Sequence, residues 1–338
     1  MSPQKLDLIA KPNEHAFAPF VRILGKGKTG SRSLTRDEAR TAMRMILHGE
    51  VKEVQLGAFL MLLRVKEESA DELTGFVEAA RDVIAAPTDI PVHLDWSSYA
   101  GKRKHLPWFL LSALALADNG LRVFMHGASG HTKGRVYTEN VLNALGIESS
   151  PTWPDVSADL DRTNFAFMPL LNLCPQLQAM IDLRNDLGLR SPVHTLVRLL
   201  NPLRADYSLQ SIFHPAYALH HQQAAANLGQ PHSAVFKGEG GEIERKPEAL
   251  CKILSVHEGT LSEEVWPKLI DGRQDQPEIL DVEHLRAVWR SEANDEYGEL
   301  AIIGTLAIAL RLLGRAENAD DAMQLARDYW SDRNLERL

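Results

Sequence analysis

The sequence predicts an α/β protein with a small all-helical domain and a larger α/β domain built on a mostly parallel central sheet. Apolar residues recur at helical spacing between residues 36 and 86, and no β-rich run interrupts them. From residue 92 to 338, short β-rich runs alternate with helical ones, which is typical of strands joined by helical crossovers. Pro87 and Pro91 lie between these regions and indicate a linker.

The helical domain is expected to begin with an irregular, proline-containing arm over residues 1–20. Three helices should follow. The first begins after Thr35, which with Glu38 has the spacing of a capping box, and breaks are expected near Gly49 and Ser69. We expect an arm and helical domain over 1–88, a helical segment near 172–200 that completes it, and an α/β domain over 89–338.

A glycine-rich segment precedes the first of these helices. Residues 25–30 formally match the G-x-G-x-x-G pattern of dinucleotide-binding proteins. That pattern requires a strand before the glycines and a helix that opens directly on them, whereas the helix cap here lies further on, at Thr35. We therefore interpret the segment as a flexible basic loop, whose Lys26 and Lys28 could reach phosphates.

The larger domain contains four β-rich runs, at residues 121–125, 165–168, 211–213 and 233–236. Residues 294–313 predict a buried helix with Ala and Gly at contact positions. Two basic loops, 101–105 and 126–135, flank a helix and a strand. We expect both loops at related ends of a βα architecture, where anionic ligands usually bind.

The charge of the chain is unevenly distributed. A net charge of −8 at first argues against nucleic-acid binding. However, residues 22–44 carry seven Lys or Arg against two acids, and residues 101–135 carry six against one. Basic patches on an acidic body predict a charged groove on one face. For the first patch an ordinary exposed helix face is the alternative, because Arg36, Arg40 and Arg44 are four residues apart.

Other features bound the compartment and the chemistry. Cys174 and Cys251 have no metal-ligand spacing and predict buried thiols in a reducing compartment. No apolar run approaches the ~20 residues of a membrane span, and the first residues lack a signal-type core. We expect a cytoplasmic protein without a membrane partner. The histidines do not form a metal set, so no metal site is expected.

The stretch from Asp95 to Gly146, which ends in Asn140-Val-Leu-Asn-Ala-Leu-Gly146, resembles the anthranilate phosphoribosyltransferase fold. This fold is glycosyltransferase family 3, which the pyrimidine nucleoside phosphorylases share. Residues 34–39, 46–50 and 55–60 are similar to the helical domain of that family, and residues 182–184, 187–190 and 199–203 to its central segments. The resemblance implies a fold of the nucleoside phosphorylase/phosphoribosyltransferase class over most of the chain.

The stretches that the resemblance assigns to catalysis depart from the family pattern. In the active enzymes a Gly-Thr-Gly-Gly-Asp loop closes on pyrophosphate, but the corresponding residues 97–104 keep only Gly101 and supply three cations. The Asn-Ile-Ser-Thr that follows becomes Pro107-Trp-Phe-Leu110. The Lys-His-Gly-Asn-Arg motif becomes Met125-His-Gly-Ala-Ser129. We therefore expect the hydroxyl, amide and cationic ligands of the reaction to be missing.

Two further losses support this expectation. The Asp-Glu pair that carries magnesium falls near Gly241-Glu-Ile-Glu244, with Ile243 at the Asp position, and a His-Pro of the aromatic-acid pocket is replaced around Asn172. The pattern is similar to the TrpD2/YbiB-like branch of the family, which is not enzymatic and binds nucleic acid. That branch implies a homodimer with positively charged grooves and little base specificity.

We therefore predict a nucleic-acid-binding protein without sequence specificity, without a catalytic residue and without a cofactor. DNA, RNA or both would be held through phosphates. Trp108 and Tyr99 could stack on unpaired bases, although Trp108 is more typical of a core residue. The predicted contacts are Lys26, Lys28, Arg32, Lys102, Arg103, Lys104, His105, Lys133, Arg135, Arg184, Arg198 and Arg204.

Two alternatives remain open. The first is an anthranilate-type phosphoribosyltransferase that uses phosphoribosyl pyrophosphate and magnesium, with Lys102 to Lys104 holding the pyrophosphate as point charges. The second is a metabolite sensor that retains a ligand pocket without turnover. For Arg184 and Arg190, pairing with nearby acids such as Asp182 and Asp186 is the alternative to ligand binding.

Overall fold

The computed structural model describes residues 9–130, 132–272, 276–277 and 279–338. Residues 1–8 of the expected arm lie outside this range. The described chain divides into two compact units. One holds the residues up to Ala85 together with Cys174–Leu200, and the other holds Ala86–Leu173 together with Asn201–Leu338.

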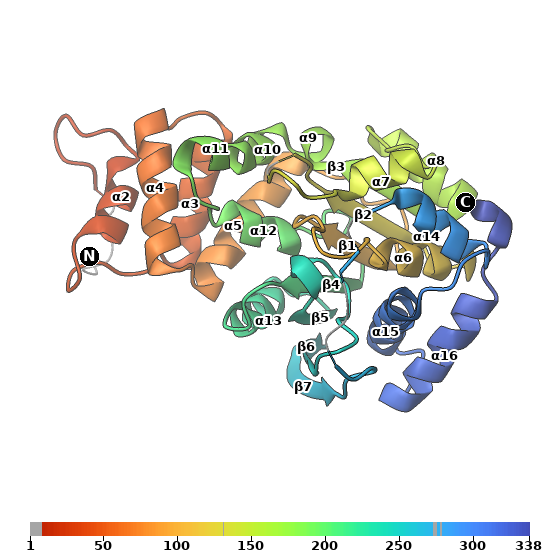
Figure 1. Ribbon diagram of the computed structural model, residues 1–338. Helices are drawn as coiled ribbons and strands as arrows, with labels where there is room; N and C mark the ends of the chain where they lie inside the picture. The colour runs from red at the N-terminus through yellow and green to blue at the C-terminus, as the bar shows by residue number, and fades with distance from the viewer. Residues whose placement is uncertain (1–8, 131, 273–275, 278) are drawn as a thin grey trace. The chain divides into compact units, whose positions relative to one another are not determined.

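The first unit is all-helical, as predicted (Figure 1). Thr35 caps α3 through a capping box with Glu38, and Ser69 caps α5 through the same motif with Glu72. Phe59 packs edge-on against Phe17 in the core. The elements are α2 (Ala18–Gly25), α3 (Arg36–Leu47), α4 (Glu53–Lys66), α5 (Ala70–Ile84), α10 (Pro175–Asp182), α11 (Arg184–Leu187), α12 (Val193–Leu196) and the 3-10 turn η1 (Val197–Leu199).

The second unit is built on a seven-stranded sheet in the order β3-β2-β1-β4-β5-β6-β7. The strands β1 to β5 pair in parallel, whereas β6 and β7 pair antiparallel at one edge. This arrangement confirms the predicted mostly parallel sheet. The strands are β1 (Leu94–Ser98), β2 (Val123–Gly127), β3 (Phe165–Pro169), β4 (Tyr207–Ile212), β5 (His232–Lys237), β6 (Cys251–His257) and β7 (Thr260–Trp266).

Helices cover both faces of this sheet. Ala234 and Phe236 of β5 belong to the large core cluster that includes α6, α15 and α16, while Val235 packs with Ala218 of α13 in a smaller cluster. The helix α15 is buried almost all round, as predicted, and α16 packs beside it (Figure 1). The helices are α6 (Phe109–Asp118), α7 (Thr138–Ala144), α8 (Trp153–Thr163), α9 (Leu170–Leu173), α13 (Tyr217–Asn227), α14 (Val282–Trp289), α15 (Glu296–Leu312), α16 (Ala319–Ser331) and the 3-10 turns η2 (Glu239–Gly241) and η3 (Leu335–Arg337).

Several local predictions can be compared with the structure. The glycine-rich segment after Gly25 follows the helix α2 instead of a strand, which agrees with the interpretation as a loop. The sequence did not predict β1, β6 or β7. Cys174 and Cys251 are buried and free, as expected. Within the described residues, no helix is both long and apolar enough to cross a membrane.

Candidate functional site

The two predicted basic loops meet at the carboxyl ends of β1 and β2. A short antiparallel bridge joins them, since the Lys102 amide donates to the Val136 carbonyl at 2.8 Å and the Val136 amide donates back at 2.7 Å. The Arg135 guanidinium donates to the carbonyls of Ala100 and Gly101 at 3.0 and 2.8 Å. Parallel strands place their carboxyl ends at one edge of the sheet, where ligands usually bind. The loops therefore form one structural element at that edge.

Lys102 does not point to solvent. Its side chain is fully buried, and its ammonium group contacts the carboxylates of Glu239 and Glu244, the latter at 2.5 Å. The Glu244 carboxylate also accepts a hydrogen bond from the Phe109 amide at 3.0 Å, at the first residue of α6. The predicted phosphate contact of Lys102 is thus wrong, because its ammonium group is buried and paired with two carboxylates.

The carboxylate of Glu242 accepts hydrogen bonds from backbone amides of the same loop. One carboxylate oxygen accepts hydrogen bonds from the amides of Ala100 and Gly101 at 2.7 and 2.6 Å, and the other accepts one from the Ser98 hydroxyl at 3.0 Å. Gly238 makes this fold possible, because a Cβ atom there would lie 1.7 Å from the Glu242 carbonyl oxygen. The acids of the 238–244 loop are therefore directed inward.

The three groups of the lysine cluster have shifted pKa values. Burial opposes charge on Lys102, but the carboxylates of Glu244 and Glu239 outweigh it and raise the lysine pKa. Burial raises the pKa of Glu244 to about 7, in spite of the adjacent lysine. At Glu239 burial acts in the same direction, but the charge of Lys102 and its hydrogen bond prevail and lower the pKa. Lys102 is therefore a charged counterion, and Glu244 titrates near neutral pH.

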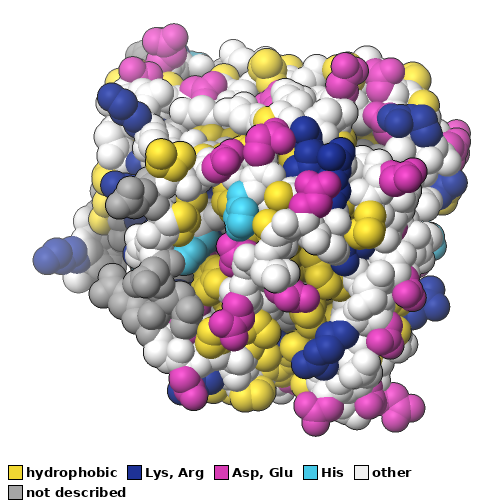
Figure 2. All heavy atoms as spheres, turned by 45° about the vertical axis from the view of Figure 1, so that its right-hand side comes forward, with side chains coloured by type: hydrophobic (Ala, Val, Ile, Leu, Met, Phe, Trp, Pro, Cys, Tyr) yellow, Lys and Arg dark blue, Asp and Glu magenta, His cyan; other side chains and the backbone are white. Residues whose placement is uncertain are grey.

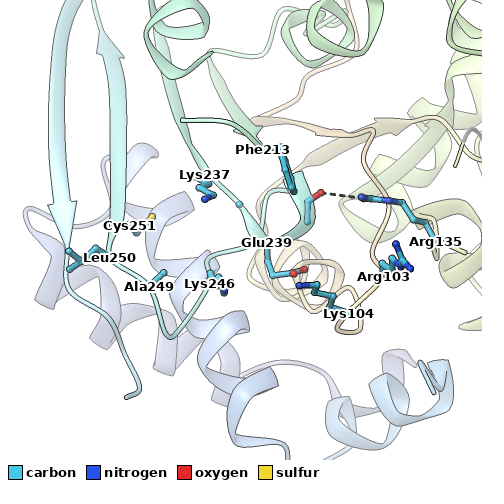
Figure 3. Close-up of a pocket in the computed structure, with 12 residues that line it drawn as sticks. Arg103, Lys104, Arg135, Phe213, Lys237, Glu239, Lys246, Ala249, Leu250 and Cys251 are labelled. Atoms are coloured by element: carbon cyan, nitrogen blue, oxygen red, sulfur yellow. Dashed lines mark hydrogen bonds between the residues drawn. The ribbon is translucent and has the colours of Figure 1, made fainter. Parts of the chain in front are cut away.

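A cavity of about 520 Å³ opens beside this buried network (Figure 3). Arg103, Lys104 and Lys237 are exposed at its wall, and in the described part of the chain none of them pairs with a carboxylate. Arg135 is half-buried, and Lys246 is exposed and pairs with Glu248 at 3.1 Å. The full lining is Arg103, Lys104, Arg135, Phe213, Lys237, Gly238, Glu239, Gly240, Lys246, Ala249, Leu250 and Cys251. We call this the cationic pocket.

The positive charge of this pocket is local. On the face drawn in Figure 2, Lys and Arg side chains are interspersed with Asp and Glu. Glu239 is the acidic member of the pocket lining, and Lys102 already neutralises it. A pocket with five cations, of which Lys246 is paired with Glu248, and one compensated acid attracts polyanions even though the chain carries a net charge of −8.

The structure brings only part of the predicted set together. Arg103, Lys104 and Arg135 line the cationic pocket. Lys133 is exposed in the second basic loop, but it is not part of the lining. Arg204 is exposed before β4, at the amino-terminal end of that strand, and therefore at the sheet edge opposite the pocket.

The remaining predicted phosphate contacts lie outside the cationic pocket, and two of them are buried. His105 is buried and stacks on Tyr297, with ring centroids 4.2 Å apart, and burial lowers its pKa. Arg198 is also buried, and its Nε donates to the His194 carbonyl. Surface contacts by these two residues were therefore wrongly predicted. In the helical unit, Lys26 and Lys28 are exposed, Arg184 is half-buried, and Arg32 pairs with Glu38 at 2.6 Å.

Sequence reasoning missed Lys237, Lys246 and Phe213. Lys237 ends β5, next to a glycine-rich turn whose acids could have repelled phosphate; the structure turns those acids inward. Phe213 directly follows β4, whereas the sequence placed it inside the β-rich run 211–213; its position at the carboxyl end of that run was the available signal. The two aromatic residues that were predicted to stack on bases, Trp108 and Tyr99, are both buried. The core interpretation of Trp108 is thereby confirmed.

Family models match two parts of the chain. Residues 20–83 match the helical bundle domain of the glycosyl transferase family, and residues 109–332 match its a/b domain. The uncharacterized protein YbiB of Escherichia coli strain K12 is 31% identical over 242 residues, which cover 70% of this chain and 75% of YbiB. An anthranilate phosphoribosyltransferase of Syntrophomonas wolfei is 30% identical over 309 residues, 87% of this chain and 88% of that enzyme.

Solved structures agree with this assignment. The anthranilate phosphoribosyltransferase from Saccharomyces cerevisiae in complex with PRPP and Mg has a TM-score of 0.79 at 14% identity, over 96% of each chain. The enzyme from Thermus thermophilus has a TM-score of 0.77 at 21% identity, over 94% of this chain and 95% of its own. At these identities the likeness establishes the fold. The chain belongs to glycosyl transferase family 3, with the anthranilate phosphoribosyltransferase fold and a YbiB-like sequence.

Proposed function

We propose that this protein binds nucleic acid through phosphate groups at the cationic pocket and does not transfer phosphoribosyl groups. The observation that carries the proposal is the separation of two layers of charge. The buried ammonium group of Lys102 forms ion pairs with Glu239 and Glu244. Arg103 and Lys104, the next residues along the chain, are instead exposed beside Lys237 and have no carboxylate partners in the described structure. Exposed, uncompensated cations around one cavity are suited to the phosphates of a polyanion.

The buried layer does not fit phosphoribosyl pyrophosphate with magnesium. In this family the glycine loop and the acidic pair would hold the pyrophosphate and the metal ion. Here the amides of Ala100 and Gly101 already donate to the Glu242 carboxylate as their anion. Glu244 is engaged by Lys102 and by the start of α6, so a cation is already present where a metal would need the carboxylate. An incoming diphosphate would have to displace buried carboxylates and approach Glu242 and Glu244 directly.

The proposed contacts predict how binding depends on salt. Each phosphate that a cation neutralises contributes about 0.7 to the log–log salt slope for a single strand and about 0.9 for duplex DNA. Five cations line the pocket, so the pocket alone supports a slope magnitude of up to about 3.5 for a single strand and about 4.5 for duplex DNA. The exposed Lys26, Lys28 and Lys133 would add to this value if the bound strand reaches them.

The formation of a homodimer, which the family resemblance implies, stays a prediction.

The test is fluorescence polarisation of a labelled oligonucleotide between about 50 and 200 mM salt. The variant Arg103→Ala/Lys104→Ala/Lys237→Ala should lower the slope magnitude by about 2 and weaken binding to unrelated sequences equally. The matched control Lys268→Ala/Arg315→Ala/Arg327→Ala removes three exposed cations outside the pocket and should retain the slope. Equal losses in the two variants, or no binding by the wild type at the lowest salt, would overturn the proposal.

A second measurement tests the transferase alternative. Anthranilate fluorescence is followed with phosphoribosyl pyrophosphate and Mg²⁺ present. We expect no loss of fluorescence above the enzyme-free rate. A measurable rate that disappears in Glu244→Gln would restore the alternative.

A further inference from the structure

Phe213 is an unusual residue of the cationic pocket. The chain has ten phenylalanines. Nine of them are buried, whereas Phe213 is 50% exposed. A large aromatic ring that stays half in water forgoes much of its hydrophobic stabilisation and keeps part of its surface available to a ligand.

The backbone fixes the ring at the mouth of the pocket. Phe213 directly follows β4, whose last residue Ile212 pairs with Lys237 at the end of β5. Gly241 lies beside it, since a Cβ added to that glycine would lie 3.5 Å from the Phe213 Cβ and 3.8 Å from the ring atom Cδ2. The ring also stands edge-on to His214, with centroids 4.9 Å apart and planes at 83°. The ring thus has neighbours in Gly241 and His214, while half of the residue remains accessible.

Cations surround the exposed ring. In the view of Figure 3, Phe213 lies between Lys237 on one side and Arg135 on the other, and all three line the same cavity. Ala249 and Leu250 provide apolar surface in that cavity, and Leu250 is 70% exposed. The volume of about 520 Å³ lies within the range of about 300–1,000 Å³ that suits small organic groups. The wall therefore offers a flat apolar surface and positive charge within one site.

We propose that Phe213 is a stacking platform for an unpaired nucleobase, so that the protein binds single strands in preference to duplex. This inference rests on the proposed binding of nucleic acid at the same pocket. A base with its phosphate combines the two chemistries that the wall provides, a planar aromatic face and a negative charge. In a duplex the bases are already stacked and paired, and only the phosphates can reach the pocket.

The experiment compares three ligands of equal length by fluorescence polarisation: a single strand, its blunt duplex and a single strand made only of abasic sites. The abasic strand keeps the phosphates but has no bases. For the wild type, the base-containing strand should bind more tightly than the abasic strand by roughly 5- to 150-fold, the range that stacking on one aromatic residue contributes. Phe213→Ala should remove this difference and leave the salt slope unchanged, because it removes no charge.

Two variants serve as controls. Phe213→Trp keeps a larger aromatic face and should retain the preference for bases. Leu219→Ala removes an apolar side chain that is 64% exposed and lies outside the pocket lining, and it should bind all three ligands as the wild type does. Thermal unfolding of each variant checks that the fold is intact.

The outcomes separate this inference from the proposed function. Salt-dependent binding in which Phe213→Ala weakens all three ligands equally, or leaves the base-containing strand unchanged, overturns the stacking role and leaves phosphate binding in place. A wild type that binds none of the ligands overturns the proposed function itself. A nucleoside monophosphate offers the same chemistry in free form. If it competes as well as the single strand at equal concentration, the pocket is a nucleotide site and the preference for strands is wrong.

Discussion

Replacement of Lys102 by methionine tests the central feature of the site, which is that this lysine belongs to the interior of the protein. Methionine keeps an unbranched stem of similar length but removes the charge. The bridge to Val136 uses backbone groups, so it survives the substitution. What is lost is the ammonium group between Glu239 and Glu244, which are 7% and 0% exposed. Removing one side of a buried ion pair costs about 3–5 kcal/mol, because the other side stays buried without compensation.

The free energy of unfolding is measured with urea near pH 8, where both carboxylates need a counterion. Lys104→Met is the matched control, because Lys104 is exposed and forms no carboxylate pair in the described structure, and its cost should stay within about 0.5 kcal/mol. The triple variant Lys102→Met/Glu239→Gln/Glu244→Gln removes all three charges and should recover most of the loss. The deficit of Lys102→Met should also shrink toward pH 5, as the unpaired carboxylates take up protons.

One result would refute this reasoning. If Lys102→Met is as stable as Lys104→Met and instead weakens oligonucleotide binding, Lys102 is a surface ligand and the buried network does not exist as described. A loss of stability with unchanged binding per folded molecule supports the internal role.

Three further predictions follow from the same region. Burial raises the folded pKa of Glu244 from 4.5 to about 7, so the folded state binds the proton more tightly than the unfolded state, and the stability linked to protonation is full below pH 4.5 and lost as pH rises through 7. The free energy of unfolding of Glu244→Gln, measured with urea, should therefore rise relative to that of the wild type by up to about 3 kcal/mol between pH 4.5 and 8. A difference that does not depend on pH contradicts this. Glu242→Ala leaves two buried amides without an acceptor and should lose about 1–3 kcal/mol for each. Added pyrophosphate should raise the Tm of this variant more than that of the wild type, because it can also accept from the two freed amides, and equal Tm shifts would contradict this. Gly101→Ala places a Cβ 2.9 Å from the Tyr137 ring at a φ of +69°, whereas at Gly134, with a φ of +73°, an added Cβ meets open space. In calorimetry Gly134→Ala should lower the free energy of unfolding by about 1–2 kcal/mol, and Gly101→Ala should lower it clearly more.

Local signals predicted α3, α4, α5 and α15, but they missed α2, whose first residues were assigned to the irregular arm over 1–20. Each capping box, at Thr35 and at Ser69, lies within four residues of sequence, so its hydrogen bonds can be predicted without knowledge of the tertiary structure. The predicted breaks near Gly49 and Ser69 fall between the observed α3, α4 and α5. The same local reasoning placed the buried helix α15, because an apolar surface all round can only be covered by other elements.

The missed strands depend on partners that lie far away in sequence. The central strand β1 contains Asp95 and two serines, which do not resemble a buried strand. In the fold, Asp95 accepts hydrogen bonds from His126 of β2 at 3.2 Å and from Ser208 of β4 at 3.3 Å. The polar group is acceptable in the interior only because both neighbouring strands satisfy it. At the other edge, β7 is polar and mostly exposed, which hides it from a search for apolar alternation.

The functional site illustrates the same limit for charge. Counting Lys and Arg along residues 101–135 gave the correct local excess, but the count treats Lys102, Arg103 and Lys104 as equivalent. The bridge to Val136 fixes the conformation at Lys102, whose side chain meets acids more than 130 residues later in the sequence, while the next two side chains remain exposed. In an exposed position, those acids would repel phosphate. Because they instead neutralise Lys102 and cap backbone amides, they leave Arg103, Lys104 and Lys237 uncompensated, and the positive character of the pocket depends on acids that lie beneath it.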